Sequence, residues 1–194
     1  RFFRPDTPPF LLTRLRTKAR VIASLNVDLL FVLRFNKALA NRSAIDFIDN
    51  VLIRGLGVRR VVIGYDFVFG KGRQGTPDLL REKLAAHGIE TTVMSPVAAG
   101  DEEASIYSST GVRDALKAGD PEGAARLLGR PFEIEGHVRR GDARGRLLGF
   151  PTANIWLDDY LRPALGVYAV RVRWDENGRQ QAFDGVANLG LRPT

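Results

Sequence analysis

The 194-residue sequence contains no cysteine, which excludes disulfide bonds, thiolate metal sites and cysteine nucleophiles together. No apolar run approaches the roughly 20 residues that span a bilayer. The first five residues, Arg-Phe-Phe-Arg-Pro, lack the apolar core of a secretion signal. We therefore expect a soluble, cytoplasmic protein that does not act in a membrane.

Hydrophobic residues make up 44% of the chain, enough to form a core in one large or two small domains. The net charge of +7 favours an anionic partner, either nucleic acid or a nucleotide phosphate, over a neutral one. The basic residues are scattered, however, and a solvated surface explains most of them equally well. The densest group lies in a glycine-containing segment and comprises Arg139, Arg140, Arg144 and Arg146.

The first 130 residues alternate between helical and strand patterns. Apolar residues at helical spacing in 13–24 precede a continuous apolar run in 28–33. The same order recurs with a helix in 43–55 and a strand in 61–63, and again with a helix and a strand in 76–94. Helices that alternate with short apolar strands predict a parallel sheet covered on both faces.

After Pro131 the period changes to that of antiparallel strands. Residues 132–138 and 167–174 alternate between apolar and polar side chains, and a turn signal in 175–178 precedes a further strand in 183–189. We therefore predict two domains: an α/β domain and an antiparallel β-barrel domain. Their predicted ranges are 1–129 and 130–194.

The segment Gly149-Phe150-Pro151-Thr152-Ala153-Asn154 follows a loop rich in glycine and arginine, residues 136–146. Glycines let a backbone approach phosphates closely, and arginine binds phosphate oxygens. The hydroxyl of Thr152 and the amide of Asn154 are hard oxygen ligands suited to Mg²⁺. The pairing predicts a nucleotide site, whose loop contacts would come from Gly136, Gly141, Gly145 and Arg146.

A second candidate site follows the strand in 61–63, where open parallel sheets bind ligands. In the segment 64–72, Asp66 can accept a hydrogen bond, and Phe67 and Phe69 offer faces to a flat ring. Aromatic side chains beside a strand also serve as core residues, and the sequence leaves both interpretations open.

A third candidate is the hydroxyl cluster Ser108-Ser109-Thr110 before a predicted helix. Such a cluster binds phosphate through side chains, free N–H groups and the helix dipole, and Arg113 lies one turn further on. Simple capping of the helix is the favoured alternative for this motif alone.

In their order along the chain, these motifs resemble the bacterial bifunctional riboflavin kinase/FMN adenylyltransferase family, also called FAD synthetase. The resemblance covers nearly the whole sequence. Its segments are Arg4 to Pro8, Gly64 to Gly72, Ser108 to Arg113, Gly129 to Pro131, Gly149 to Asn154, Gly166 to Val170 and Asn188 to Thr194.

The resemblance implies a Rossmann-like nucleotidyltransferase domain followed by a flavokinase barrel. It implies two Mg²⁺-dependent reactions: ATP phosphorylates riboflavin to FMN, and a second ATP adenylylates FMN to FAD. In the first, Thr152 and Asn154 would hold the metal while the loop 136–146 closes over ATP. In the second, Asp66 and Phe67 would face the flavin, and the triphosphate would contact Ser108, Ser109, Thr110 and Arg113.

The sequence also departs from that family. The family's His-x-Gly-His motif is absent, since the only histidines are His87 and His137. We interpret both as structural. The family's acidic kinase base lies downstream of the region ending at Thr194. We therefore expect a portion of a longer protein that by itself catalyses both reactions poorly.

Two other functions remain open: a nucleotidyltransferase for another small molecule, and a basic nucleic-acid-binding protein. The segment 149–154 disfavours the first. The second predicts aromatic residues interleaved with basic ones on strands, and 167–174 offers only Tyr168 and Trp174. An uncovered edge of the parallel sheet leaves self-association into a homo-oligomer open.

Overall fold

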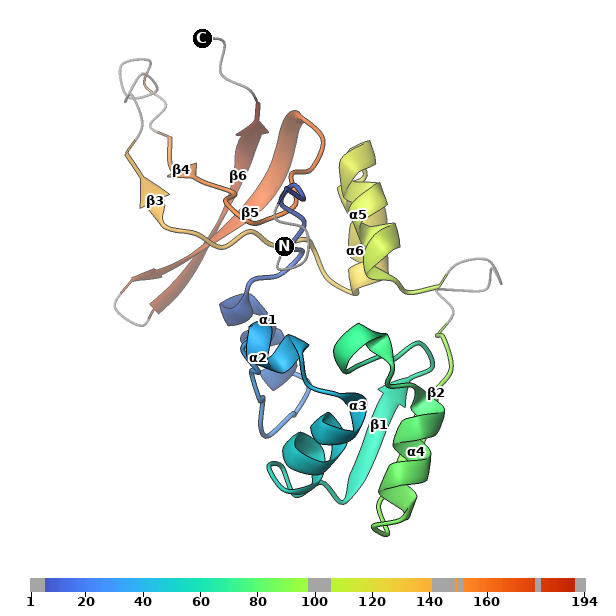
Figure 1. Ribbon diagram of the computed structural model, residues 1–194. Helices are drawn as coiled ribbons and strands as arrows, with labels where there is room; N and C mark the ends of the chain where they lie inside the picture. The colour runs from blue at the N-terminus through green and yellow to red at the C-terminus, as the bar shows by residue number, and fades with distance from the viewer. Residues whose placement is uncertain (1–5, 98–105, 141–148, 150–151, 177–178, 191–194) are drawn as a thin grey trace. The chain divides into compact units, whose positions relative to one another are not determined.

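The computed structural model describes residues 6–97, 106–140, 149, 152–176 and 179–190. By its contacts the chain forms two units (Figure 1). The described part of Leu29–Tyr107 belongs to the first, and Asp6–Asp28 joins Ser108–Thr194 in the second. The predicted division of the chain after residue 129 stays a prediction.

The first unit consists of short helices and two strands. Ser43 and Thr76 cap helices as their types predict, because each hydroxyl accepts a backbone N–H three residues on, at 3.0 and 3.2 Å. Its elements are α2 (Lys37–Ala40), α3 (Ala44–Asp46), the π-helical η1 (Phe47–Ile53), β1 (Arg60–Gly64), the 3₁₀ turn η2 (Lys71–Arg73), α4 (Pro77–Ala85) and β2 (Glu90–Met94).

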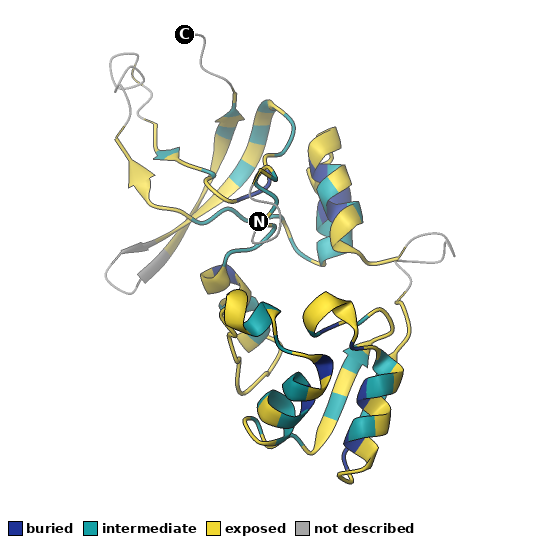
Figure 2. Cartoon of the chain, viewed as in Figure 1, coloured by how far each residue is buried: buried dark blue, intermediate teal, exposed yellow. Residues whose placement is uncertain are grey.

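The strands β1 and β2 pair in parallel, from Arg60 opposite Glu90 to Gly64 opposite Met94, which confirms the predicted parallel sheet. The helix α4 makes the connection between them. Figure 2 shows buried residues on α3 and α4 beside the strands. The apolar core of this unit comprises Ala44, Ile48, Phe69, Leu80, Leu84 and Ile89.

The strand predicted in 28–33 is wrong. These residues form no helix or strand, and Leu29 and Phe31 are 67% and 58% exposed. A parallel strand is stable only beside a neighbour that completes its hydrogen bonds. In the described residues the parallel sheet contains only β1 and β2, so the apolar run has no strand to pair with.

The second unit combines helices with antiparallel strands. Ser108 and Asp120 cap its two central helices, and Gly119 and Gly129 follow them with φ of 80° and 68°. Its elements are α1 (Leu15–Ala23), α5 (Ser109–Ala118), α6 (Pro121–Leu128), β3 (Val138–Arg139), β4 (Asn154–Ile155), β5 (Gly166–Glu176) and β6 (Arg179–Leu189).

The predicted hairpin is confirmed, because β5 and β6 pair antiparallel from Gly166 opposite Leu189 to Glu176 opposite Arg179. The predicted strand in 132–138 is wrong over most of its length. Only Val138 belongs to a strand, because the preceding residues contact α1 through their side chains and not a neighbouring strand. Among the described residues, the strands form separate pairs and no closed barrel.

Candidate functional site

The segment after β1 turns sharply at the carboxyl end of the sheet. Tyr65 N–H donates to the carbonyl of Met94 on β2 at 3.0 Å, and Phe67 N–H donates back to the carbonyl of Gly64 at 3.2 Å. The turn therefore begins directly where both strands end. Asp66 lies at its tip and is exposed.

Two aromatic rings of this turn share one stack but differ in burial. The rings of Phe67 and Phe69 lie 5.3 Å apart, centroid to centroid, at 22°. Phe69 is 9% exposed and belongs to the core, so the core alternative holds for it. Phe67 packs on that core but keeps part of its surface accessible, as a ligand-binding ring requires.

Glycines fix the far side of the turn. Gly70 has φ of 73°, and a Cβ there would lie 2.6 Å from the backbone nitrogen of Ala44. Phe69 and Gly75 exchange two backbone hydrogen bonds, at 3.2 and 2.8 Å. This part of the segment is therefore a close-packed backbone support for Asp66 and Phe67.

The hydroxyl cluster lies at the start of α5, in the second unit. Ser108 Oγ accepts a hydrogen bond from Gly111 N–H at 3.0 Å, so the capping alternative holds for Ser108. The next two residues, Ser109 and Thr110, are exposed. Their hydroxyls lie in the first turn of α5, where anions are stabilised.

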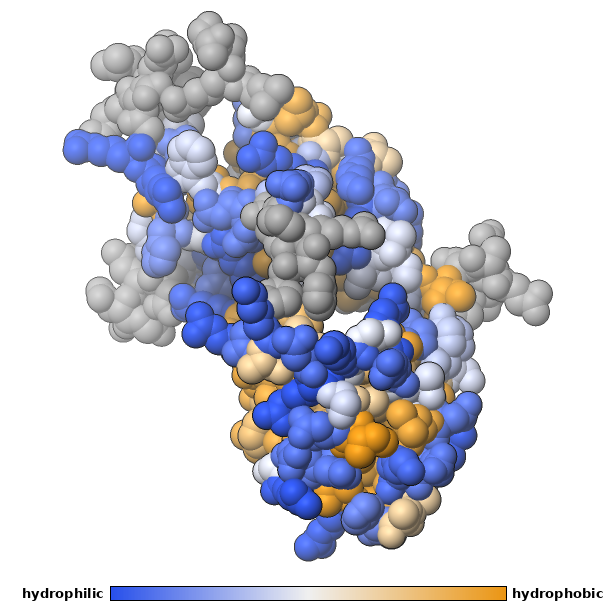
Figure 3. Space-filling model, in the orientation of Figure 1, coloured by the Kyte–Doolittle hydropathy of each residue, from blue (hydrophilic) through white to orange (hydrophobic). Residues whose placement is uncertain are grey.

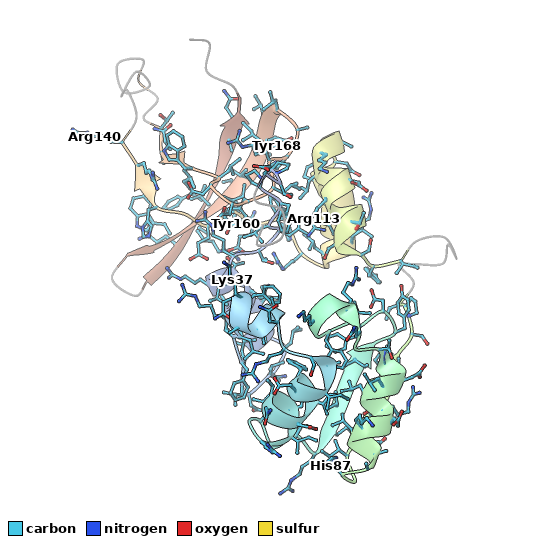
Figure 4. All side chains as sticks on the ribbon, in the orientation of Figure 1. Lys37, His87, Arg113, Arg140, Tyr160 and Tyr168 are labelled. Carbon is cyan, nitrogen blue, oxygen red and sulfur yellow. The ribbon has the colours of Figure 1, made fainter. Side chains whose placement is uncertain are left out.

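Arg113, labelled in Figure 4, has a partner that the sequence did not predict. Its Nε–H donates to the carbonyl of Phe10 at 3.1 Å, and its guanidinium lies 5.7 Å from the centre of the Phe10 ring. The two residues are 103 positions apart, a separation that local spacing cannot reveal. Arg113 therefore binds the N-terminal segment to α5.

The predicted metal ligands lie on or beside the short pair β3–β4. Asn154 stands opposite Arg139 in this ladder and is half-buried, and Thr152 precedes the strand and is exposed. Among the described residues neither side-chain oxygen has a hydrogen-bond partner. One hydroxyl and one amide oxygen fit Mg²⁺, which binds few protein ligands beside substrate phosphates.

The predicted loop contacts are described only in part. A Cβ on Gly136 would lie 2.7 Å from Cγ2 of Ile155, so glycine is needed there for β3 to approach β4. Arg140 at the end of β3 is exposed (Figure 4). Gly141, Gly145 and Arg146 lie outside the described residues.

A group of acidic residues before β3 contacts α1 and was missed by the sequence patterns. Glu133 accepts from Arg20 at 2.5 Å and pairs with Arg173 at 3.2 Å. Burial alone would raise the pKa of Glu133, but the hydrogen bond from Arg20, with the charges of Arg20, Arg173 and Arg130, holds that pKa below its ordinary value. Alternation of polar and apolar residues there had suggested a strand.

Some of the basic residues are paired with acidic neighbours. Ten Lys or Arg side chains form ion pairs with carboxylates within the described part of the chain. Figure 3 shows hydrophilic side chains over most of the visible face, with apolar ones visible on both units. No described helix has the length and apolarity needed to cross a membrane.

Comparison with known families divides the chain into two matches. The model of the FAD synthetase family matches residues 1–110, and that of riboflavin kinase matches residues 128–194. The first match covers more than half of the chain and includes the turn after β1 and the whole hydroxyl cluster, but not Arg113. The second includes both predicted metal ligands.

Curated relatives carry one name, bifunctional riboflavin kinase/FMN adenylyltransferase. The Escherichia coli K12 protein is 40% identical over 99% of this chain and 59% of its own length. The Pseudomonas fluorescens protein is 42% identical over 100% of this chain and 60% of its own length. The Bacillus subtilis protein is 40% identical over 98% of this chain and 58% of its own length. The chain thus spans about three fifths of the length of these relatives.

Among solved structures, the chain is similar to one titled as a macrolide-efflux protein from Streptococcus pneumoniae. The TM-score is 0.72 at 26% identity, over 100% of this chain and 66% of that one.

Proposed function

Since the chain belongs to the FAD synthetase family, we propose that it forms part of an enzyme that makes FAD in two ATP-dependent steps. Riboflavin is phosphorylated to FMN, and FMN is then adenylylated to FAD. The observation that carries the proposal is the order of the two family matches, which together contain every predicted ligand residue except Arg113. For the segments that the two family models match, we propose a Rossmann-like nucleotidyltransferase fold and a flavokinase-type barrel, respectively.

In the kinase reaction, Thr152 and Asn154 hold Mg²⁺ with their side-chain oxygens. Bound Mg²⁺ offsets the negative charge of the ATP phosphates. The backbone at Gly136, Gly141 and Gly145 approaches those phosphates, and Arg146 binds their oxygens. These residues orient the terminal phosphate toward the riboflavin hydroxyl, because positioning and charge neutralisation supply most of the rate in phosphoryl transfer.

In the adenylylation reaction, Phe67 stacks on the flavin ring and Asp66 accepts a hydrogen bond from it. The exposed hydroxyls of Ser109 and Thr110 donate to the ATP phosphates, with Ser108 shaping the start of α5. Arg113 uses one N–H on Phe10, and its remaining guanidinium N–H groups bind the phosphate whose charge grows as pyrophosphate leaves.

Calorimetric titration of the chain with ADP tests the kinase site. We expect Mg²⁺ to strengthen ADP binding, and Thr152→Ala and Asn154→Ala each to weaken it by about tenfold or more, as loss of a metal ligand does. The control is Thr92→Ala on β2, which removes the same hydroxyl from the first unit. Equal ADP affinity with and without Mg²⁺ would contradict the proposal.

Titration with FMN in the absence of nucleotide tests the adenylylation site. Phe67→Leu keeps an apolar side chain on the core but removes the stacking face, so we expect FMN binding to weaken by about tenfold, the upper range of one aromatic contact. Phe183→Leu on β6 is the matched control, since that ring is 53% exposed and lies in the other unit. Unaltered FMN binding by Phe67→Leu would contradict a role of Phe67 in stacking on the flavin.

A further inference from the structure

Glu135 is held at both its side chain and its backbone. Thr17 Oγ1 on α1 donates to Glu135 Oε2 at 2.8 Å, and Arg16 Nε lies 3.0 Å from Oε1. The N–H of Glu135 donates to the hydroxyl of Tyr160 at 3.2 Å. Thr17 and Tyr160 are both fully buried, at 0% exposure, whereas the side chain of Glu135 is 32% exposed, so both contacts are partly buried.

Further contacts hold the buried partner Tyr160 in place. Tyr160 is anchored because Leu11 N–H donates to the carbonyl of Asp159 at 3.1 Å, and Leu161 N–H donates to the carbonyl of Leu11 at 2.9 Å. The guanidinium of Arg14 lies 4.8 Å from the centre of the Tyr160 ring. Residues 11–17 therefore contact both Tyr160 and Glu135.

Glu135 lies directly before the strand pair that carries a predicted metal ligand. The next residue, Gly136, approaches the side chain of Ile155, and two positions later β3 begins. Each of β3 and β4 has only two residues, too few to fix their pairing by ladder hydrogen bonds alone. The position of Asn154, opposite Arg139, thus depends on what holds the entrance of β3.

We propose that Glu135 is a positioning residue, through which α1 holds β3 and β4 and so sets the place of Asn154. The inference rests on the proposed function and deepens it. The helix α1 falls within the FAD synthetase match and Glu135 within the riboflavin kinase match. The two matched segments are therefore linked inside one unit, and the affinity of the kinase site for Mg²⁺-ADP depends on a helix outside the riboflavin kinase match.

The contacts of Glu135 differ in how much each is expected to contribute to its position. Arg16 is 84% exposed on its side chain, so its ion pair with Glu135 contributes little. Thr17 is fully buried, so loss of its hydroxyl leaves a carboxylate oxygen without its donor. Thr17→Val removes only the hydroxyl, Thr17→Ser restores it, and Glu135→Ala removes the acceptor.

Calorimetry with Mg²⁺-ADP on the 194-residue chain tests the inference. We expect Thr17→Val and Glu135→Ala each to weaken binding by about tenfold, as partners that support a metal ligand do. The double variant should lose no more than either single one, because both changes break one contact. Thr17→Ser should recover the affinity. Asp184→Ala, which removes the carboxylate of an exposed pair with Arg171, should retain it.

Hydrogen exchange at the amides of β3 and β4 provides a readout that needs no ligand. Faster exchange in Thr17→Val and Glu135→Ala, but not in Asp184→Ala, supports a positioning role for Glu135. This holds even if the unaltered chain binds no Mg²⁺-ADP, because absence of ADP binding contradicts only the proposed function. Unchanged exchange in both variants overturns the inference. Losses of ADP affinity that multiply in the double variant also overturn it, because the two residues would then act independently.

Discussion

The two units support their candidate ligand groups by different physics. In the first, Asp66 and Phe67 rest on a buried aromatic ring and on glycines packed against α3. In the second, the strand pair with Asn154 is held by a carboxylate, a hydroxyl and a phenol that come from distant parts of the chain. Apolar packing spreads over many atoms, whereas the polar support depends on single donor and acceptor atoms.

The largest expected effect is on the apolar support. Phe69→Ala should lower the free energy of unfolding of the first unit by about 3–5 kcal/mol, because the ring is buried among core residues. Phe31→Ala, the same change at a ring that is 58% exposed, should cost less than about 1 kcal/mol. Urea unfolding followed by hydrogen exchange on β1 measures both. Equal costs would show that Phe69 does not support the turn.

A backbone change in the same turn should have the next largest effect. Gly70→Ala combines positive φ with a Cβ only 2.6 Å from the Ala44 nitrogen, so we expect a loss of about 3 kcal/mol. Gly57→Ala is the control, because Gly57 also has positive φ but no heavy atom within 4 Å. It should cost about 1 kcal/mol, measured by the same unfolding experiment. Equal losses of unfolding free energy in Gly70→Ala and Gly57→Ala would mean that a Cβ close to Ala44 does not destabilise the unit.

Removal of the cap of α5 separates a structural from a ligand-binding role. Ser108→Ala should destabilise the second unit by about 1 kcal/mol, since Gly111 N–H loses its acceptor. Ser109→Ala should leave stability nearly unchanged but weaken ATP binding, because its hydroxyl is exposed. Thermal unfolding and ATP titration of both variants measure the two effects. If Ser109→Ala lowers stability and not ATP affinity, Ser109 has no part in the site.

The smallest effect concerns pH. The pKa of Glu133 is lowered on folding, so its ion pairs contribute stability that is complete above the ordinary pKa of glutamate and is lost as pH falls through the lowered folded value. Glu133→Gln should therefore flatten the acid side of the stability curve of the second unit. Urea unfolding between neutral and acidic pH measures this. An unchanged pH dependence in Glu133→Gln would mean that the ion pairs of Glu133 do not contribute to stability.

Local patterns in the sequence predicted the elements that local physics determines. The helices that begin after Ser43 and Thr76, the strands β1 and β2, and the hairpin β5–β6 follow from side-chain spacing and turn residues. The apolar run in 28–33 did not form a strand, because strand formation needs a partner that composition does not reveal. The motif order also identified the family, since each motif retained its place along the chain.

The supports of the candidate sites were not predictable in the same way. The contacts of Arg113 with Phe10 and of Thr17 with Glu135 join residues 103 and 118 positions apart. Spacing rules for helices and strands act over a few residues only. The alternation in 132–138 predicts a strand, yet the partly buried Glu133 and Glu135 contact basic and hydroxyl groups of α1.

Flavin binding at the kinase site can be measured by titrating riboflavin fluorescence with the folded 194-residue chain, with and without Mg²⁺-ADP. We expect saturable quenching that Mg²⁺-ADP strengthens, and we expect Thr152→Ala to make the quenching insensitive to Mg²⁺-ADP. Absence of quenching by a sample with native hydrogen-exchange protection would contradict this expectation, as would quenching by Thr152→Ala that Mg²⁺-ADP strengthens as much as in the unaltered chain.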